Sequence, residues 1–387
     1  MNIFIVSRGY PTPKDPQWGC FELDQARALK ELGHQVVVIS VDGRFRLYWR
    51  KIGITKFVNE GIGFINIFLC PIKLFALLSP KYIVKIKVKQ LLYIYKKAVD
   101  IYGIPDIVYA HYMFNIAHST FLKEKYNIPV VGMEHWSQLN KARLNKLERY
   151  MGELAYGRTN EIIAVSESLR LRIKEHFGRD SLVIHNMVGK EFFMNPVREK
   201  TERKSITFIS VGSLLPVKGY DILIKAMNRI SNDILSWELI LVGEGPERGH
   251  LQNMVHKYGL SNHIKLLGRR NKIEIIRLLD NSDVYISSSR SENFSVSVIE
   301  GLSRGLPVVA TLCGGIRECI DDRNGLLVPV EDEESLAEAI HRMAETIGNY
   351  SRLEISKTCE SRFAPQVIAK QLTCVFEEAI ESNNKHQ

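Results

Sequence analysis

Short apolar runs rich in valine and isoleucine alternate with longer stretches of helical periodicity along almost the whole chain. Such runs, bounded by turn residues, predict buried strands, and the stretches between them predict covering helices. In the first half the predicted strands are Ile3–Val6, Gln35–Ile39, Ile107–Ala110, Val130–Met133, Glu161–Val165 and Leu182–His185. In the second half they are Ile206–Val211, Glu238–Val242, Ile264–Leu266, Val284–Ser287, Pro307–Ala310 and Gly325–Val328.

This alternation predicts an α/β protein with two facing, doubly wound, Rossmann-like domains and a cleft between the carboxyl ends of their strands. The polar, aperiodic segment Asn195–Lys204 is the predicted linker. We expect one domain over residues 1–190 and a second over residues 205–360. A helix within residues 361–387 either completes the second domain or crosses back to the first.

The composition fits an ordinary soluble protein, because 45% of the 387 residues are hydrophobic and 25% are charged. Met1–Val6 has no basic leader and reads as a strand, and no window has the roughly 18 apolar residues of a membrane span. The six cysteines form no Cys-x-x-Cys pair. This cysteine pattern indicates reduced thiols and a cytoplasmic location.

Positive charge is concentrated in the first half of the chain. Residues 1–190 hold 28 Lys and Arg against 16 Asp and Glu, or +12, which leaves −3 for the remainder. Residues 43–97 alone hold 12 basic residues and one acidic residue. An anionic partner for the N-terminal domain is the expectation.

The strongest local pattern opens the second half. Strand Ile206–Val211 runs into a loop over residues 212–219, which contains Gly212, Ser213 and Lys218, and a helix is predicted from Tyr220. Glycines let backbone amides approach an anion, a helix N-terminus adds positive potential, and the lysine adds a full charge. The loop favours a diphosphate site, and an ordinary strand-to-helix turn is the alternative.

A second glycine cluster begins at Gly243, also after a strand. It is not a dinucleotide-binding fingerprint, because its third glycine, Gly249, comes one position late. A tight structural turn explains much of it. Further along, Glu292 precedes a predicted helix and Glu300 projects from that helix, so one carboxylate can accept hydrogen bonds from sugar hydroxyls and the other from a ribose diol. Structural roles for both carboxylates remain open.

Taken together and in order, these segments resemble the family 4 retaining glycosyltransferases of the two-domain B-type fold. The similarity covers essentially the whole predicted second domain. It is carried by Gly212 with Lys218-Gly219, Val242–Pro246, Glu292 with Glu300, Gly305 with Pro307, Gly314-Gly315 with Glu318, and Asn324–Val328.

The resemblance implies that Lys218 binds the donor diphosphate, that Glu292 contacts the sugar and that Glu300 contacts the ribose. The other implied donor-binding positions are Gly212, Ser213, Gly243, Arg269, Asn293, Phe294 and Ser295. It further implies retention of anomeric configuration, a UDP- or GDP-linked sugar as donor and no cofactor. No Asp-x-Asp motif occurs, so no metal site is predicted.

Two positions depart from the family pattern. Ser213 stands where an arginine is usual, and Asn293 stands where a glycine is usual. Arg290 is the candidate for the missing cation.

The N-terminal half is similar more loosely. The resemblance places Gly19 under the donor phosphates or the acceptor, and it implies a histidine that contacts the sugar after a later strand. His135 is the first choice for this catalytic position, beside Lys218 and Glu292, and His111 is the alternative. A lone histidine at a strand end is otherwise usually a core residue, and Glu134 is a neighbour that can orient it.

Residues Lys81–Tyr102 predict a basic amphipathic helix, and the segment before it, Phe68–Leu78, is unusually apolar. Together they suggest peripheral contact with an anionic membrane at its inner face, and hence a saccharide acceptor that is lipid-linked, in cell-surface polysaccharide or glycolipid synthesis. A core helix with a solvated lysine face is the alternative.

Other functions are open on the same fold. They are a sugar-nucleotide epimerase, a glycogen-type phosphorylase and a catalytically degenerate partner subunit. Nucleic-acid binding is not expected, because the basic region has few aromatic residues spaced for base stacking.

Overall fold

The computed structural model describes residues 1–15, 18–44, 52–69, 80–195, 197, 205–230 and 236–385. Nearly all of the predicted linker and of the apolar segment Phe68–Leu78 lies outside the described residues. The chain forms two compact units. Unit 1 is Met1–His185 with Pro365–Gln387, and unit 2 is Asn186–Ala364.

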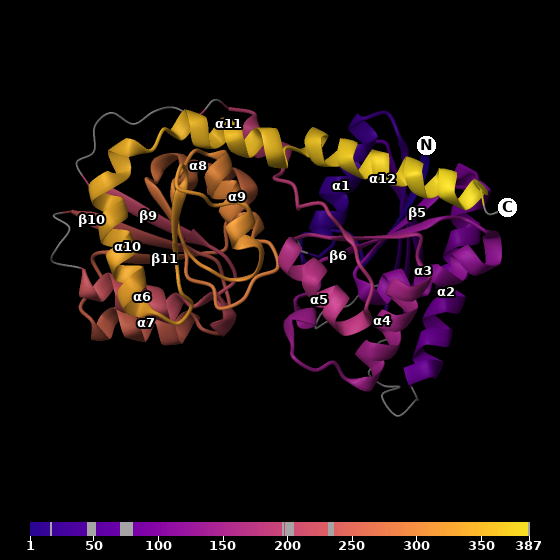
Figure 1. The fold of residues 1–387 in the computed structure, drawn as a ribbon, viewed down its shortest axis with the longest axis horizontal. Helices are drawn as coiled ribbons and strands as arrows, with labels where there is room; N and C mark the ends of the chain where they lie inside the picture. The colour runs from indigo at the N-terminus through magenta and orange to yellow at the C-terminus, as the bar shows by residue number, and fades with distance from the viewer. Residues whose placement is uncertain are drawn as a thin grey trace. The chain divides into compact units, whose positions relative to one another are not determined.

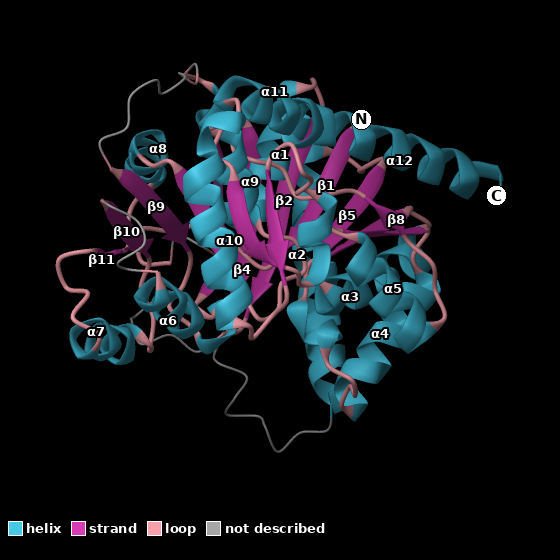
Figure 2. Ribbon diagram, turned by 60° about the vertical axis from the view of Figure 1, so that its left-hand side comes forward, coloured by secondary structure: helices cyan, strands magenta, loops and turns pink. Residues whose placement is uncertain are grey.

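Unit 1 is built on an eight-stranded sheet of order β3-β4-β2-β1-β5-β6-β7-β8, which is parallel except for the pairing of β3 with β4 (Figure 2). The strands are β1 (Asn2–Ser7), β2 (Gln35–Asp42), β3 (Gly53–Asn59), β4 (Ile62–Phe68), β5 (Ile107–His111), β6 (Val130–Glu134), β7 (Glu161–Ala164) and β8 (Leu182–Val183). The helices are α1 (Cys20–Glu31), α2 (Pro80–Tyr102), α3 (Met113–Tyr126), α4 (Lys146–Arg158), α5 (Glu167–Phe177) and α12 (Pro365–Lys385), with the 3₁₀ helix η2 (Ser137–Asn140).

Unit 2 has a six-stranded parallel sheet of order β11-β10-β9-β12-β13-β14. Its strands are β9 (Ile206–Val211), β10 (Trp237–Val242), β11 (Ile264–Gly268), β12 (Val284–Ser287), β13 (Val308–Thr311) and β14 (Gly325–Val328). Its α-helices are α6 (Tyr220–Arg229), α7 (Arg248–Lys257), α8 (Lys272–Asn281), α9 (Val296–Ser303), α10 (Glu333–Thr346) and α11 (Arg352–Phe363). Its 3₁₀ helices are η3 (Lys190–Phe193), η4 (Pro216–Lys218), η5 (Gly314–Glu318) and η6 (Ile347–Asn349).

In both units the strands are apolar because helices cover both faces of the sheet. Five of the six residues of β1 and all of β5 and β6 are buried, as expected of central parallel strands covered on two faces. In both units the α/β expectation is confirmed. The prediction missed the hairpin of β3 and β4, and it extended β8 two residues too far.

The C-terminal helix α12 packs on α1 and belongs to unit 1, so the chain leaves this unit after His185 and returns to it at Pro365 (Figure 1). His34 Nε2 lies 3.0 Å from Thr373 Oγ1, and Asn383 Nδ2 donates to the carbonyl of Asn127 at 3.1 Å. None of the described helices is long and apolar enough to cross a membrane.

Candidate functional site

In unit 2 a lysine and a glutamate meet at the carboxyl end of the sheet. Lys218 is the last residue of η4, in the loop that follows β9, and its Nζ donates to Glu292 Oε1 at 2.5 Å. The same oxygen accepts a hydrogen bond from Ser289 Oγ at 2.8 Å. The side chains of Lys218 and Glu292 are 23% and 14% exposed, so the pair is accessible to a small ligand at one side.

The loop of residues 212–219 is fastened to the segment after β12. Ser288 Oγ donates to the carbonyl of Lys218 at 3.0 Å, and Arg290 N donates to the carbonyl of Val217 at 2.8 Å. Gly219 has a φ of 63°, and a Cβ built on it would lie 2.0 Å from the carbonyl oxygen of Ser288. Only glycine allows this approach, and it holds Lys218 beside Glu292.

A second loop supports the first from the other side. Leu214 N donates to the carbonyl of Glu244 at 3.0 Å, and Gly243 N donates to that of Gly268 at 3.0 Å. A Cβ on Gly243 would lie 1.8 Å from the carbonyl oxygen of Gly212. The turn at Gly243 is therefore a support for the 212–219 loop. Arg269, which follows Gly268, is exposed beside this support.

The predicted positions around α9 divide into two kinds. Asn293, Phe294 and Ser295 are buried before the helix begins, and the ring of Phe294 packs against Phe363 at a centroid distance of 5.6 Å. These three residues shape the loop; Asn293 also accepts a hydrogen bond at its carbonyl from Gly315 N at 3.0 Å. Glu300 is half-buried on α9.

Glu300 precedes Gly301 on α9, which packs against the Tyr285 ring of β12. Burial is the main cause that raises the pKa of Tyr285, and the charge of Glu300 adds to it. The Tyr285 hydroxyl in turn donates to the carbonyl of Val211, the last residue of β9, at 3.1 Å. Glu300 is thus near the start of the 212–219 loop.

Arg290 is engaged elsewhere. Its guanidinium donates to both carboxylate oxygens of Asp221 at 2.9 and 2.8 Å, and it also pairs with Glu331. Two carboxylates therefore balance its charge. This arrangement weakens the hypothesis that Arg290 replaces the cation missing at Ser213, a half-buried residue in the 212–219 loop.

In unit 1 the two candidate histidines lie together. His111 ends β5 and His135 follows β6, and His111 Nδ1 lies 3.1 Å from His135 Nε2. Their rings are stacked at 5.3 Å with an interplanar angle of 9°. Burial lowers the pKa of His111 to about 4, so this ring is neutral at physiological pH.

A partly buried ion pair, which the sequence did not predict, lies beside the histidines. Arg8 Nε donates to Glu22 Oε1 at 3.0 Å, and the Arg8 guanidinium lies 3.7 Å from the centre of the Tyr112 ring. Burial alone would raise the pKa of Glu22, but Arg8 and His111 outweigh it and hold the pKa at about 2. The only signal in the sequence is an acidic residue in the first turn of a helix, which usually marks favourable interaction with the helix dipole.

Gly19 and Glu134 fix the backbone on either side of this cluster. Gly19 begins α1 with a φ of 79°, next to the backbone of Gly9 after β1. Glu134 Oε1 accepts hydrogen bonds from the backbone N of His135 and Trp136 at 3.0 and 2.8 Å. The carboxylate thereby holds the backbone that carries His135.

Within the described part of the chain, no group of three or more His, Cys, Asp and Glu side chains could hold a metal ion. In unit 2 the candidate site offers a lysine, two carboxylates and helix-end amides. In unit 1 it offers two histidines and the Arg8–Glu22 pair. Such groups suit a ligand that carries both negative charge and hydroxyls.

Two family models match the chain in succession. The model described as Glycosyltransferase Family 4 matches residues 23–192, and the model described as Glycosyl transferases group 1 matches residues 193–354. Together they cover residues 23–354, which include most of both units.

Individual proteins show the same relationship. An uncharacterized glycosyltransferase of Methanocaldococcus jannaschii is 32% identical over 247 residues, which are 63% of this chain and 67% of that protein. One component of the human phosphatidylinositol N-acetylglucosaminyltransferase is 25% identical over 352 residues, 88% of this chain and 68% of that protein. Other curated relatives are matched over about half of their own length.

A solved structure shows the fold. HepE of Anabaena, in complex with UDP, superposes with a TM-score of 0.74 over 98% of this chain and all of that one, at 19% sequence identity. The chain thus shares the two Rossmann-like domains of that protein. From the paired family models and the M. jannaschii relative, it follows that this chain is a member of the family 4 glycosyltransferases.

Proposed function

We propose that this glycosyltransferase moves a sugar from a nucleotide diphosphate sugar to a saccharide acceptor and retains the anomeric configuration. The observation that carries the proposal is the contact of Lys218 with Glu292 at the carboxyl end of the unit 2 sheet. A donor has a diphosphate and a sugar joined by one bond, so its site needs a cation and a hydroxyl acceptor side by side. Without ligand the two groups neutralise each other; with donor bound, the diphosphate takes Lys218 and the sugar hydroxyls take Glu292.

The remaining donor contacts follow from the same loops. Glu300, half-buried on α9, is assigned to the ribose diol, and the backbone around Arg269 is assigned to the base. We favour a uridine donor because the HepE structure contains UDP, and a guanosine donor is the alternative. Gly19, Gly212, Ser213 and Gly243 are assigned to the loops that enclose the phosphates.

The chemical step breaks the bond from the anomeric carbon to the diphosphate oxygen. The acceptor hydroxyl attacks from the same face, and its proton passes to the departing diphosphate. Negative charge develops on the diphosphate, where Lys218 and the amides of the 212–219 loop stabilise it. His135 is assigned to a hydrogen bond with the sugar, which holds it for attack. No residue is assigned to a metal ion.

Replacing Lys218 tests the donor site. Lys218→Ala should lower kcat by roughly 10²-fold or more, because a charge that acts on the leaving group is lost. Lys225→Ala is the matched control: this lysine on α6 pairs loosely with Glu333 at 3.8 Å and should leave turnover unchanged. Turnover of the Lys218 variant equal to that of the control would exclude the assignment.

We further propose a lipid-linked saccharide as the acceptor, presented at the inner face of a membrane that the chain contacts peripherally. The human relative is named for a phosphatidylinositol, which is a lipid. In addition, the exposed residues of α2 include Lys85, Lys89 and Lys96. Each basic residue near an anionic surface contributes about 1 kcal/mol. Flotation with anionic vesicles at low salt should carry the protein upward, and a protein left at the bottom of the gradient would contradict membrane contact.

The competing functions are an epimerase and a degenerate partner subunit. Ser213 favours the degenerate subunit. Because a serine stands where the family usually has an arginine, Lys218 is the single basic residue of the 212–219 loop. Release of nucleotide that depends on an added acceptor would exclude both.

A further inference from the structure

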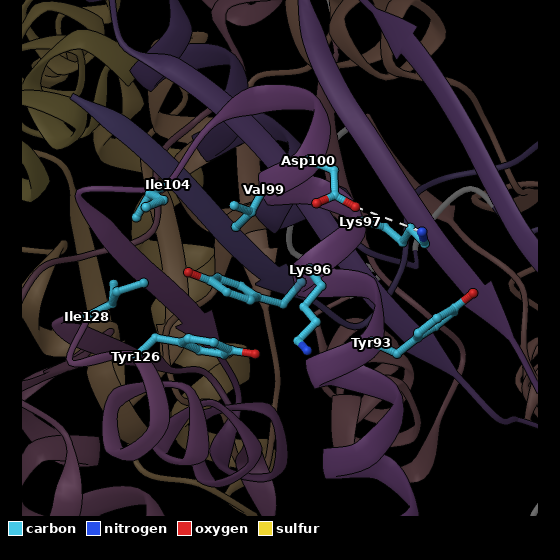
Figure 3. Close-up of a pocket in the computed structure, with 9 residues that line it drawn as sticks. Tyr93, Lys96, Lys97, Val99, Asp100, Ile104, Tyr126 and Ile128 are labelled. Carbon is cyan, nitrogen blue, oxygen red and sulfur yellow. Dashed lines mark ion pairs between the residues drawn. The ribbon is translucent and has the colours of Figure 1, made fainter.

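A cavity of about 600 Å³ lies in unit 1, away from the histidines. Its walls come from the C-terminal part of α2, the end of α3 and the residues that precede β5 and β6. They include Tyr93, Tyr95, Lys96, Ile104, Tyr126 and Ile128 (Figure 3). This volume falls within the roughly 300–1,000 Å³ typical of small-molecule sites.

Within unit 1, the cavity lies at the opposite end of the strands from the His111–His135 pair. Ile104 precedes β5 and Ile128 precedes β6, whereas His111 and Glu134 are the last residues of those strands. The strands are parallel, so the cavity is at their amino ends. It is therefore separate from the cluster of His111 and His135 at the carboxyl ends of the same strands.

The interior of the cavity is apolar and aromatic. The rings of Tyr95 and Tyr126 stack at 4.9 Å with an interplanar angle of 27°. Ile104, at the mouth, is 71% exposed. Tyr126 Oη is buried, and it has no hydrogen-bond partner among the described residues.

The rim is positively charged. Lys96 is exposed and forms no ion pair with any described residue. The next residue, Lys97, also lines the cavity, and its Nζ lies 3.8 Å from Asp100 Oδ2. In Figure 3 the Lys96 amine and the Tyr126 hydroxyl point toward the same part of the cavity. An apolar, aromatic interior beneath the Lys96 ammonium group suits an anionic amphiphile.

The surface around the rim indicates where such an amphiphile comes from. On α2 the exposed residues at helical spacing are Tyr82, Lys85, Lys89, Tyr93, Lys96 and, as the one acidic member among the described residues, Asp100. Tyr82 and Tyr93 are 54% and 47% exposed. Tyrosines interleaved with lysines on one helix face are typical of a helix that lies at a membrane interface.

We propose that this cavity binds one anionic phospholipid of the membrane, with the phosphate on Lys96 and part of an acyl chain between Tyr126 and Ile104. The site extends the proposed membrane contact, on which it rests. It would give the enzyme a preference for anionic bilayers at a point remote from the reacting groups.

Titration calorimetry with short-chain lipid below its micelle concentration isolates the cavity from bilayer charge. Dihexanoyl phosphatidylglycerol should bind the full-length protein saturably, and dihexanoyl phosphatidylcholine should bind at least about tenfold more weakly. Lys96→Glu should weaken the anionic lipid by about tenfold or more. Lys89→Glu, with the same charge change on the same helix face but outside the cavity, should retain wild-type affinity.

A cavity-filling change provides the second arm. Val99→Trp fills the cavity without changing its charge and should abolish lipid binding, while the circular dichroism spectrum and nucleotide affinity stay unchanged. Equal weakening by Lys89→Glu and Lys96→Glu, or wild-type affinity of the Val99 variant, would overturn the proposal. Nucleotide binding in the same samples separates this failure from a failure of the proposed transfer.

Discussion

Glu134 is a carboxylate held in surroundings that favour its neutral form. Burial raises its pKa to about 7, although hydrogen bonds from Tyr156 and from the backbone N of Trp136 and His135 act in the opposite direction. Tyr156 Oη lies 2.7 Å from Glu134 Oε2. The folded chain therefore binds a proton here between about pH 4.5 and pH 7, where the unfolded chain does not.

The sign of the pH dependence follows. Because the folded pKa is raised, the stability from this group is present below the unfolded pKa of 4.5 and is lost as pH rises through 7. Glu134→Gln imitates the protonated form: its oxygen accepts from both backbone amides and its nitrogen donates to Tyr156. We expect the variant to gain stability relative to wild type by on the order of 1 kcal/mol per pH unit across this window. Thermal melts near pH 5 and pH 8 measure the gain, and a melting difference that is the same at both pH values would contradict it.

The part of the site that could be predicted consists of residues whose local sequence stands out. Lys218 and Glu292 are in loops between strands, where a polar residue among glycines is conspicuous, and the structure does bring them together. Arg8 and Glu22 carry no such mark. Their pairing depends on the packing of α1 against β1, a contact between distant positions that hydrophobic periodicity does not encode.

At the scale of elements, the loops after the unit 2 strands support one another through backbone contact. Gly243→Ala places a methyl carbon only 1.8 Å from the carbonyl oxygen of Gly212. Two such atoms cannot be this close, so the 212–219 loop must move. We expect a loss of nucleotide affinity and turnover, with the fold of unit 2 retained. Gly249→Ala is the control, since a Cβ there meets nothing within 4 Å and a helical alanine is more stable than glycine by about 0.5–1 kcal/mol. Equal nucleotide affinity in the two variants would show that the support is dispensable.

The hairpin of β3 and β4 shows where element prediction stops. β3 is an edge strand whose residues are all partly or fully exposed, so burial leaves no apolar pattern in its sequence. β4 is buried, but Gly63 and Asn66 interrupt its apolar run. Gly63 makes room for the Tyr102 ring, and Asn66 accepts a hydrogen bond from Ser40 at 2.6 Å. Both reasons are tertiary contacts, which a local pattern does not contain.

At the scale of the whole molecule, the path of the chain makes unit 1 depend on its last helix, whereas unit 2 is one continuous segment. Phe376 on α12 is fully buried, with its ring 4.9 Å from that of Tyr109 on β5. Phe376→Ala should therefore destabilise unit 1 by roughly 3–5 kcal/mol. Glu378→Ala, an exposed change on the same helix, should stay within about 0.5 kcal/mol of wild type.

Nucleotide binding then reports whether the two units behave independently. Lys218, Glu292 and Glu300 all belong to unit 2, so saturating nucleotide should still raise the melting temperature of unit 2 in the Phe376 variant. A calorimetric scan should show the unit 1 transition moved to lower temperature and the unit 2 transition still responding to ligand. If nucleotide affinity falls at temperatures where unit 1 of the Phe376 variant has unfolded, residues of unit 1 contribute to the donor site, as proposed for Gly19, and Gly19 and His135 are the first to test.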